Sequence, residues 1–152
     1  MNKMKVLFCG LLAFATAMPC AQAAGEAHLL FHMGVGAQGK FAVGGTVQNK
    51  GDAPVTSGYV VILPVDEKCN PMTPVMQTFG PLAPGQKTQF NIPVSNKLSA
   101  YHIGSFAAFD DEGFALKTTD ETASIIAGRE PAERKKCESR RSGESAKAPT
   151  QP

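Results

Sequence analysis

Apolar and polar residues alternate with a period of two along most of the chain after residue 23, a pattern typical of half-buried β-strands. Two clear examples are residues 41–48 and residues 88–94. Residues 59–65 are instead apolar on both faces, which predicts a central strand. No stretch shows the apolar stripe of an amphipathic helix. The pattern therefore predicts a protein built from β-strands.

Turn signals separate these segments and set the number of strands. Pro84-Gly85 and residues 110–113 mark turns, and Pro93 places its strand at a sheet edge because proline cannot donate to the ladder. We expect further strands at residues 29–33, 75–79, 101–109, 114–117 and 123–127. Seven or eight short strands predict an all-β antiparallel β-sandwich over residues 24–128, with an antiparallel barrel as the alternative.

Three short motifs resemble a known family. Residues 45–55 read GTVQNKGDAPV, residues 59–62 read YVVI, and residues 82–90 read LAPGQKTQF. Together they are similar to the small immunoglobulin-like modules of bacterial exported proteins, such as the FxLYD- and CARDB-type domains. The resemblance covers residues 40–117 and implies an immunoglobulin-like β-sandwich with an adhesive, scaffolding or accessory role.

The first 23 residues have the three parts of a secretory signal peptide. Lys3 and Lys5 provide the positive start, residues 6–17 form a short apolar segment, and Ala21-Gln22-Ala23 is a small-x-small cleavage site. We expect cleavage near Ala23 and export to the periplasm or the medium. The apolar segment is shorter than the ~20 residues of a membrane-spanning helix, so we expect no integral membrane span.

Charge divides the rest of the chain into an acidic body and a basic tail. Residues 24–128 contain six Lys/Arg and nine Asp/Glu, whereas residues 129–152 contain seven and four. Neither part has the strongly basic surface of a nucleic-acid-binding protein. Residues 129–152 are also poor in apolar residues. We expect a disordered basic tail with a transient helical turn near residues 132–137, because this segment cannot bury enough surface to offset its conformational entropy.

The cysteines predict a disulfide between the body and the tail. Cys9 and Cys20 leave with the signal peptide, and lipid attachment at Cys20 is disfavoured because Pro19 departs from the lipoprotein pattern. Cys69 and Cys137 remain as an even pair in an oxidising compartment. Two free thiols, or a bond between two chains, are the alternatives.

Methionine and histidine side chains are soft or borderline ligands that suit copper. The candidate ligands are His28, His32, Met33, Met72 and Met76, with His102 as a further histidine. If their strand alternates regularly, His28 and His32 share one face and Met33 points the other way. A periplasmic copper-binding protein is therefore one hypothesis for the function.

The sequence contains neither Gly-x-Ser-x-Gly nor His-Glu-x-x-His, so we expect no enzyme. Asp110, Asp111 and Glu112 form an acidic cluster that is typical of a solvated turn, with a weak surface calcium site as the alternative. We therefore expect a non-enzymatic exported binding or accessory module. Its partner would be another periplasmic or cell-envelope protein, and copper binding is the alternative function.

Overall fold

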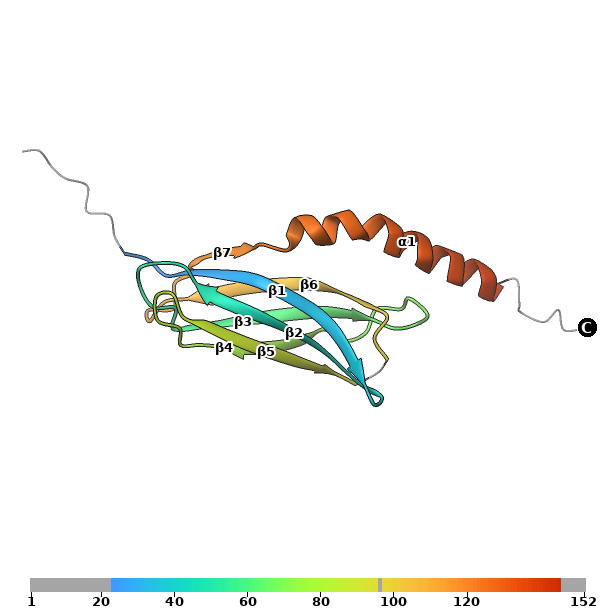
Figure 1. Cartoon of the computed structure of the whole chain (residues 1–152), viewed down its shortest axis with the longest axis horizontal. Coiled ribbons are helices and arrows are strands. Elements are labelled where there is room, and N and C mark those ends of the chain that lie inside the picture. Colours follow the sequence, from blue (N-terminus) through green and yellow to red (C-terminus); the bar gives the residue numbers. More distant parts are fainter. Residues whose placement is uncertain (1–22, 96, 146–152) are drawn as a thin grey trace, which may run out of the picture.

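The described residues form two facing β-sheets and one helix that runs along their outside (Figure 1). The computed structural model describes residues 23–95 and 97–145. One sheet has the strand order β5-β2-β1-β7 and the other β4-β3-β6. The strands are β1 (Glu26–Ala37), β2 (Lys40–Asn49), β3 (Ser57–Val65), β4 (Val75–Phe79), β5 (Lys87–Val94), β6 (Ala100–Phe109) and β7 (Lys117–Asp120). The predicted β-sandwich is confirmed.

Several individual strands also lie where the sequence predicted them. The doubly apolar β3 is the central strand of its sheet, and β5, which contains Pro93, is an edge strand. Residues 114–117 differ from the expectation. The turn after β6 closes with a single bridge between Phe109 and Ala115, and the chain then crosses to pair β7 with β1 in parallel.

The core lies between the two sheets and is closed at one end by a buried asparagine. Its side chains come from both sheets and from the segments between them, namely Leu29, Val43, Val47, Val55, Val60, Ile62, Leu82, Phe90, Ile92 and Ala108. Asn49 is fully buried at the end of β2. Its Oδ1 accepts hydrogen bonds from the backbone N–H groups of Glu26 and Gly51, and its Nδ2 donates to two further carbonyls. One side chain thereby joins the start of β1, the loop after β2 and the segment around Leu82, with both of its polar atoms satisfied.

A β-bulge interrupts the regular alternation of β1. The register with β2 shifts between Leu29 and Phe31. Before the bulge, Ala27 and Leu29 point into the core; after it, His32 is buried while Phe31 and Met33 are exposed. An extra residue in one strand reverses which face each later side chain occupies. His28 and His32 therefore lie on opposite faces, and the prediction that they share a face is wrong.

The helix α1 (Ala123–Ser145) corrects two further expectations. Residues 123–127 form its first turns rather than a strand, and residues 129–145 are helical rather than disordered; residues 146–152 lie outside the described residues. The helix starts where the Thr122 carbonyl accepts hydrogen bonds from the N–H groups of Ile125 and Ile126. Residues 129–145 are rich in glutamate, lysine and arginine residues, which have high helix propensity. This propensity favours a helix even though the segment has no apolar stripe.

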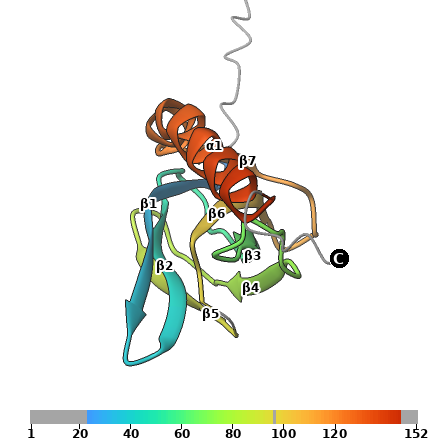
Figure 2. The ribbon, with the colours of Figure 1, turned by 90° about the vertical axis from the view of Figure 1, so that its right-hand side faces the viewer.

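Tertiary anchors hold this polar helix in place. Cys69 and Cys137 form the predicted disulfide, with their sulfur atoms 2.07 Å apart. Arg140 donates to the Glu67 carbonyl at 2.9 Å, and Arg141 donates to the Cys69 carbonyl at 2.7 Å. Figure 2 shows α1 lying across the side of the sandwich where β1, β6 and β7 meet. The helix is thus tied at its start by β7 and near its end by the loop after β3.

The loop that presents Cys69 is organised by Asp66. The Asp66 carboxylate accepts hydrogen bonds from the N–H groups of Lys68 and Asn70, at 2.9 and 2.8 Å. The Asn70 hydrogen bond is the main cause that lowers the pKa of Asp66. This turn holds Cys69 at a positive φ of 63°, a conformation that few residues with a side chain adopt.

Among residues 23–95 and 97–145, no helix is both long and apolar enough to cross a membrane.

Removing the disulfide should release α1 while leaving the sandwich folded. In a Cys69→Ser/Cys137→Ser variant, we expect amide hydrogen exchange to become fast from Gly128 to Ser145, because an isolated polar helix interrupted by Pro131 is marginal in water. The free energy of unfolding should fall by up to ~4 kcal/mol in the chain-entropy estimate for a loop of 68 residues. Amides of β2 and β3 serve as the internal control. Protection of α1 equal to that of the wild type would contradict this anchoring.

Candidate functional site

The outer face of β1 carries a row of three large apolar side chains. Phe31, Met33 and Val35 are 51%, 48% and 45% exposed. They occupy every second position after the bulge, so all three point away from the core. We call these three residues the β1 stripe.

Small and polar neighbours leave the β1 stripe uncovered. On the same face, β2 and β5 contribute Ala42, Gly44, Thr46, Gln89, Asn91 and Pro93. Gly44 and Ala42 lie directly beside Met33 and Val35 and are too short to cover their sides. The amides of β5 form a polar margin. An apolar surface bordered by polar groups is typical of a protein interaction site.

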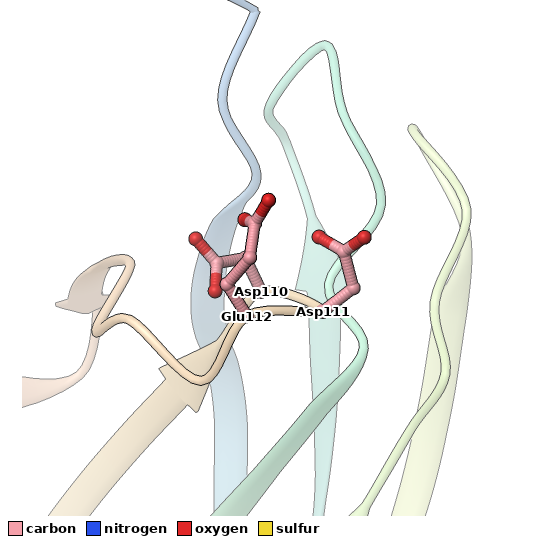
Figure 3. Close-up of side chains that lie close together, drawn as sticks. All are labelled: Asp110, Asp111 and Glu112. Carbon is pink, nitrogen blue, oxygen red and sulfur yellow. The ribbon is translucent and has the colours of Figure 1, made fainter.

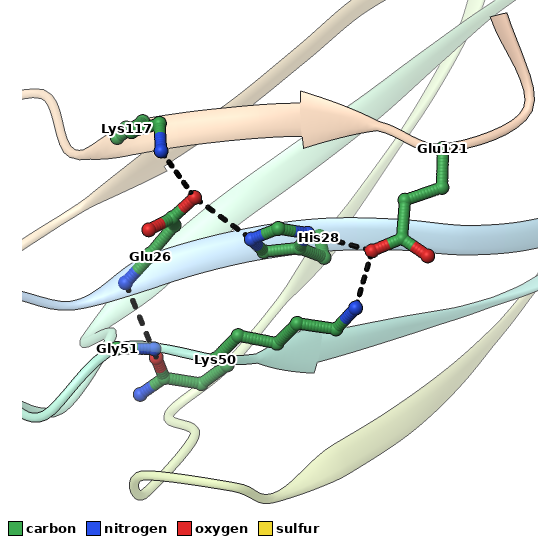
Figure 4. A network of polar contacts seen from close by, with 7 residues as sticks. Glu26, His28, Lys50, Gly51, Lys117 and Glu121 are labelled. Carbon is green, nitrogen blue, oxygen red and sulfur yellow. Dashed lines mark hydrogen bonds and ion pairs between the residues drawn. The ribbon is translucent and has the colours of Figure 1, made fainter.

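A network of charged side chains lies at the other end of β1 (Figure 4). His28 is at its centre: Nε2 lies 2.8 Å from Glu26 Oε1, and Nδ1 lies 2.8 Å from Glu121 Oε1. Lys117 pairs with Glu26 at 2.8 Å, and Lys50 pairs with Glu121. Positive and negative groups thus alternate across β7, β1 and β2. Both ring nitrogens can donate to these carboxylates only when the imidazole is protonated.

This network joins strands and keeps its two carboxylates ionised. The hydrogen bond from Lys117, followed by that from His28, lowers the pKa of Glu26. The bonds from Lys50 and His28 do the same for Glu121. Both carboxylates therefore remain ionised acceptors, and neither has the raised pKa of a general acid. The arrangement fixes the start of β1 against β7 and β2.

A second polar chain runs from β6 to the start of α1 through His32. The Tyr101 hydroxyl lies 2.7 Å from His32 Nδ1, and Thr122 Oγ1 lies 2.7 Å from His32 Nε2. Thr122 Oγ1 in turn donates to Asp120 Oδ1 at 2.7 Å. Because the Thr122 proton is directed at Asp120, Thr122 accepts from Nε2–H, and Nδ1 accepts from Tyr101. His32 is then a neutral imidazole with both nitrogens occupied.

The pKa shifts of His32 and Tyr101 agree with a structural role for this series of hydrogen bonds. Burial lowers the pKa of His32, against a smaller opposing effect of the Asp120 charge. Burial also raises the pKa of Tyr101 to about 12. Tyr101 therefore stays protonated and His32 stays neutral at physiological pH, with both ring nitrogens of His32 occupied by hydrogen bonds.

The five predicted copper ligands do not converge in the structure. His28 and His32 lie on opposite faces of β1, with all four ring nitrogens in hydrogen bonds. Met33 lies on the outer face, five positions from His28, which corresponds to ~16 Å along a strand. Met72 packs against the core before β4, and Met76 is exposed on β4 in the other sheet. The remaining histidine, His102, lies on β6 and pairs with Leu63.

The acidic cluster lies in the turn after β6 (Figure 3). Oxygen atoms of Asp110, Asp111 and Glu112 lie within 4.8 Å of one another. Asp110 Oδ1 accepts a hydrogen bond from the N–H of Phe114 at 2.7 Å, which closes the turn. The cluster therefore has a local structural role that explains its position.

Sequence reasoning missed the β1 stripe and the partners of His28. The predicted first strand stopped at residue 33, whereas β1 continues to Ala37. The alternation of Phe31, Met33 and Val35 with His32 and glycines was the available signal. The contact between His28 and Glu121 spans 93 residues and depends on the parallel pairing of β7 with β1, so no local pattern indicates it.

Substituting His32 should flatten the dependence of stability on pH. The folded-state pKa of His32 lies below its ordinary value of 6.5, so its stabilising contribution is complete above pH 6.5 and is lost as the pH falls towards the folded pKa. For one proton, the free energy of unfolding changes by at most ~1.4 kcal/mol per pH unit. Urea unfolding between about pH 7.5 and pH 5 should show a smaller loss of stability in His32→Gln than in the wild type.

His102→Gln is the matched control and should retain the wild-type slope. Equal slopes in the wild type and in His32→Gln would show that His32 does not titrate in this way.

Comparisons with known proteins give no family for this chain. No family model matches it, and no curated protein matches it. The solved structure described as the structural characterization of IrmA from Escherichia coli is similar at 9% sequence identity and a TM-score of 0.42. The match covers 66% of this chain and 92% of that chain. A likeness at this level carries no argument about function, and the chain is therefore characterised by its own geometry.

Proposed function

We propose that the chain is an exported, non-enzymatic binding module that contacts another cell-envelope protein through the β1 stripe. The observation that supports this proposal is the row of Phe31, Met33 and Val35 on the outer face of the larger sheet. Each side chain is about half exposed, so covering the row would remove a substantial apolar area from water. The rigid sheet beneath holds the three side chains in a fixed spacing at little entropic cost on binding.

The proposed location is supported by the sequence and by the disulfide. Residues 1–22 lie outside the described residues, but their charged start, short apolar segment and cleavage site are typical of a signal peptide. Disulfides persist in the periplasm and outside the cell and are rare in the cytosol. The bond between Cys69 and Cys137 fits an exported protein. The resemblance to immunoglobulin-like modules of exported proteins agrees with an accessory role.

The proposal of a non-enzymatic role rests on how the polar groups are used. The carboxylates beside His28 are paired with lysines, and the imidazole of His32 is committed to Tyr101 and Thr122. Catalytic groups need free, convergent polar atoms near a reacting centre. Neither histidine provides one. We do not propose copper binding, because the five candidate ligands are dispersed over two sheets and the loop before β4.

A photocrosslinking amino acid at position 31 or 35 should capture a defined partner in cells that export the chain. The same crosslinker at Phe114, which is 70% exposed in an isolated position, is the matched control and should give no such adduct. In a chain with the crosslinker at 35, Met33→Ser should reduce the yield of the adduct, because loss of one buried apolar side chain weakens binding roughly tenfold.

Met76→Ser, on the outer face of the other sheet, should leave the yield unchanged. Adducts of equal yield at positions 31 and 114, or an adduct insensitive to Met33→Ser, would contradict the β1 stripe as the binding surface.

A further inference from the structure

A cleft of about 390 Å³ lies between α1 and the sandwich. Its floor is formed by Gly34, Gly36 and Tyr101, its apolar wall includes Phe41 and Leu98, and α1 supplies the opposite side with Ile126, Arg129 and Glu133. Small-molecule sites in proteins have volumes of this order and combine an apolar lining with a few polar groups. The cleft shares Met33 and Val35 with the β1 stripe, whereas Phe31 does not line it.

The cleft exists because two elements fail to fill the space between them. Among the α1 side chains that the structure describes, only Ile126 and Cys137 are partly buried. The disulfide and the arginines near residue 140 hold the helix, so it does not pack directly on the strands. On β1, the space beside Gly34 is occupied by Leu98 and Tyr101, and the space beside Gly36 is occupied by Phe41. These three side chains line the cleft.

The cleft has one cation without a partner. Arg134 pairs with Glu130 at 2.7 Å, and Arg140 and Arg141 bind carbonyl oxygens, whereas Arg129 has no hydrogen-bond or ion-pair partner among the described residues. Glu133 lies one turn after Arg129 but forms no ion pair with it; an arginine that precedes its acid by four residues is the less favourable order. The guanidinium is thus free to bind an anion at the mouth of an apolar space.

We propose that this cleft binds a small amphipathic monocarboxylate, of the fatty-acid class, with its carboxylate on Arg129 and its apolar chain against Ile126, Leu98 and Phe41. Arginine binds carboxylates through paired N–H donors, which favours this headgroup over a neutral one. Glu133 on the same wall disfavours a second negative charge on the ligand. This proposal does not depend on the function proposed for the β1 stripe.

Tyr101 lines the same cleft, and its hydroxyl is bound to the buried His32. Tyr101 donates its proton to His32, so its oxygen retains acceptor capacity only and does not attract the carboxylate. Burial raises the pKa of Tyr101 to about 12, and the Arg129 charge opposes this with a smaller effect. Arg129 is therefore the group that binds the carboxylate of the ligand, and the aromatic and aliphatic side chains bind its apolar chain.

The test uses the oxidised full chain after export, with displacement of a dansyl-labelled undecanoate probe by dodecanoate, dodecanol and dodecanedioate. We expect saturable binding with one site per chain and dodecanoate as the tightest ligand. Arg129→Gln should weaken the binding of dodecanoate about fivefold, which is the upper range for a partly exposed ion pair. The affinity for dodecanol should be unchanged. Arg134→Gln is the matched charge control, because Arg134 already pairs with Glu130.

A second pair of variants tests the apolar wall. Ile126→Asp should weaken dodecanoate more than tenfold, because it places a charge against the ligand chain. Ile125→Asp should have no effect, because Ile125 is 56% exposed and does not line the cleft. Circular dichroism and thermal unfolding of each variant check that the helix remains folded.

Three results would overturn the proposal. One is the absence of saturable binding up to millimolar dodecanoate. Another is an equal effect of Ile125→Asp and Ile126→Asp. The third is loss of the probe signal in Phe31→Ser but not in Ile126→Asp, which would place the probe on the β1 stripe instead.

Discussion

The bulge in β1 is the constraint on which both proposed binding surfaces depend. One extra residue between Leu29 and Phe31 reverses the faces of all later side chains in the strand. Without it, Phe31 and Met33 would point into the core and His32 would face solvent. With it, His32 is buried and the large apolar residues form a row on the surface. The same reversal places Gly34 and Gly36 against the Tyr101 and Phe41 side chains at the cleft next to α1.

The remaining interactions fix the surroundings of this bent strand. Asn49 and the charged network around His28 hold the first half of β1 against its neighbours. The chain from Tyr101 through His32 to Thr122 connects the second half to β6 and to the start of α1. The disulfide holds the other end of α1. The helix therefore keeps its place through a few specific anchors, while most of its side chains remain in water.

The sequence predicted what depends on local periodicity and missed what depends on distant contacts. The alternation in residues 41–48 and 88–94 gave β2 and β5, Pro93 gave the sheet edge, and the even cysteine pair gave the disulfide. The helical state of residues 129–145 was missed because tertiary anchors, which have no local signature, oppose the entropy that favours disorder. The expectation that His28 and His32 share a face was wrong because regular alternation does not allow for a bulge.

The orientation of the side chains after the bulge can be measured directly. Three variants, Phe31→Cys, His32→Cys and Met33→Cys, each add one thiol to the chain while the native disulfide stays intact. Maleimide labelling of the folded protein should be fast at positions 31 and 33 and slow at position 32, because only His32 is buried. Labelling that is fast at position 32 and slow at its two neighbours would contradict the bulge, and with it the β1 stripe.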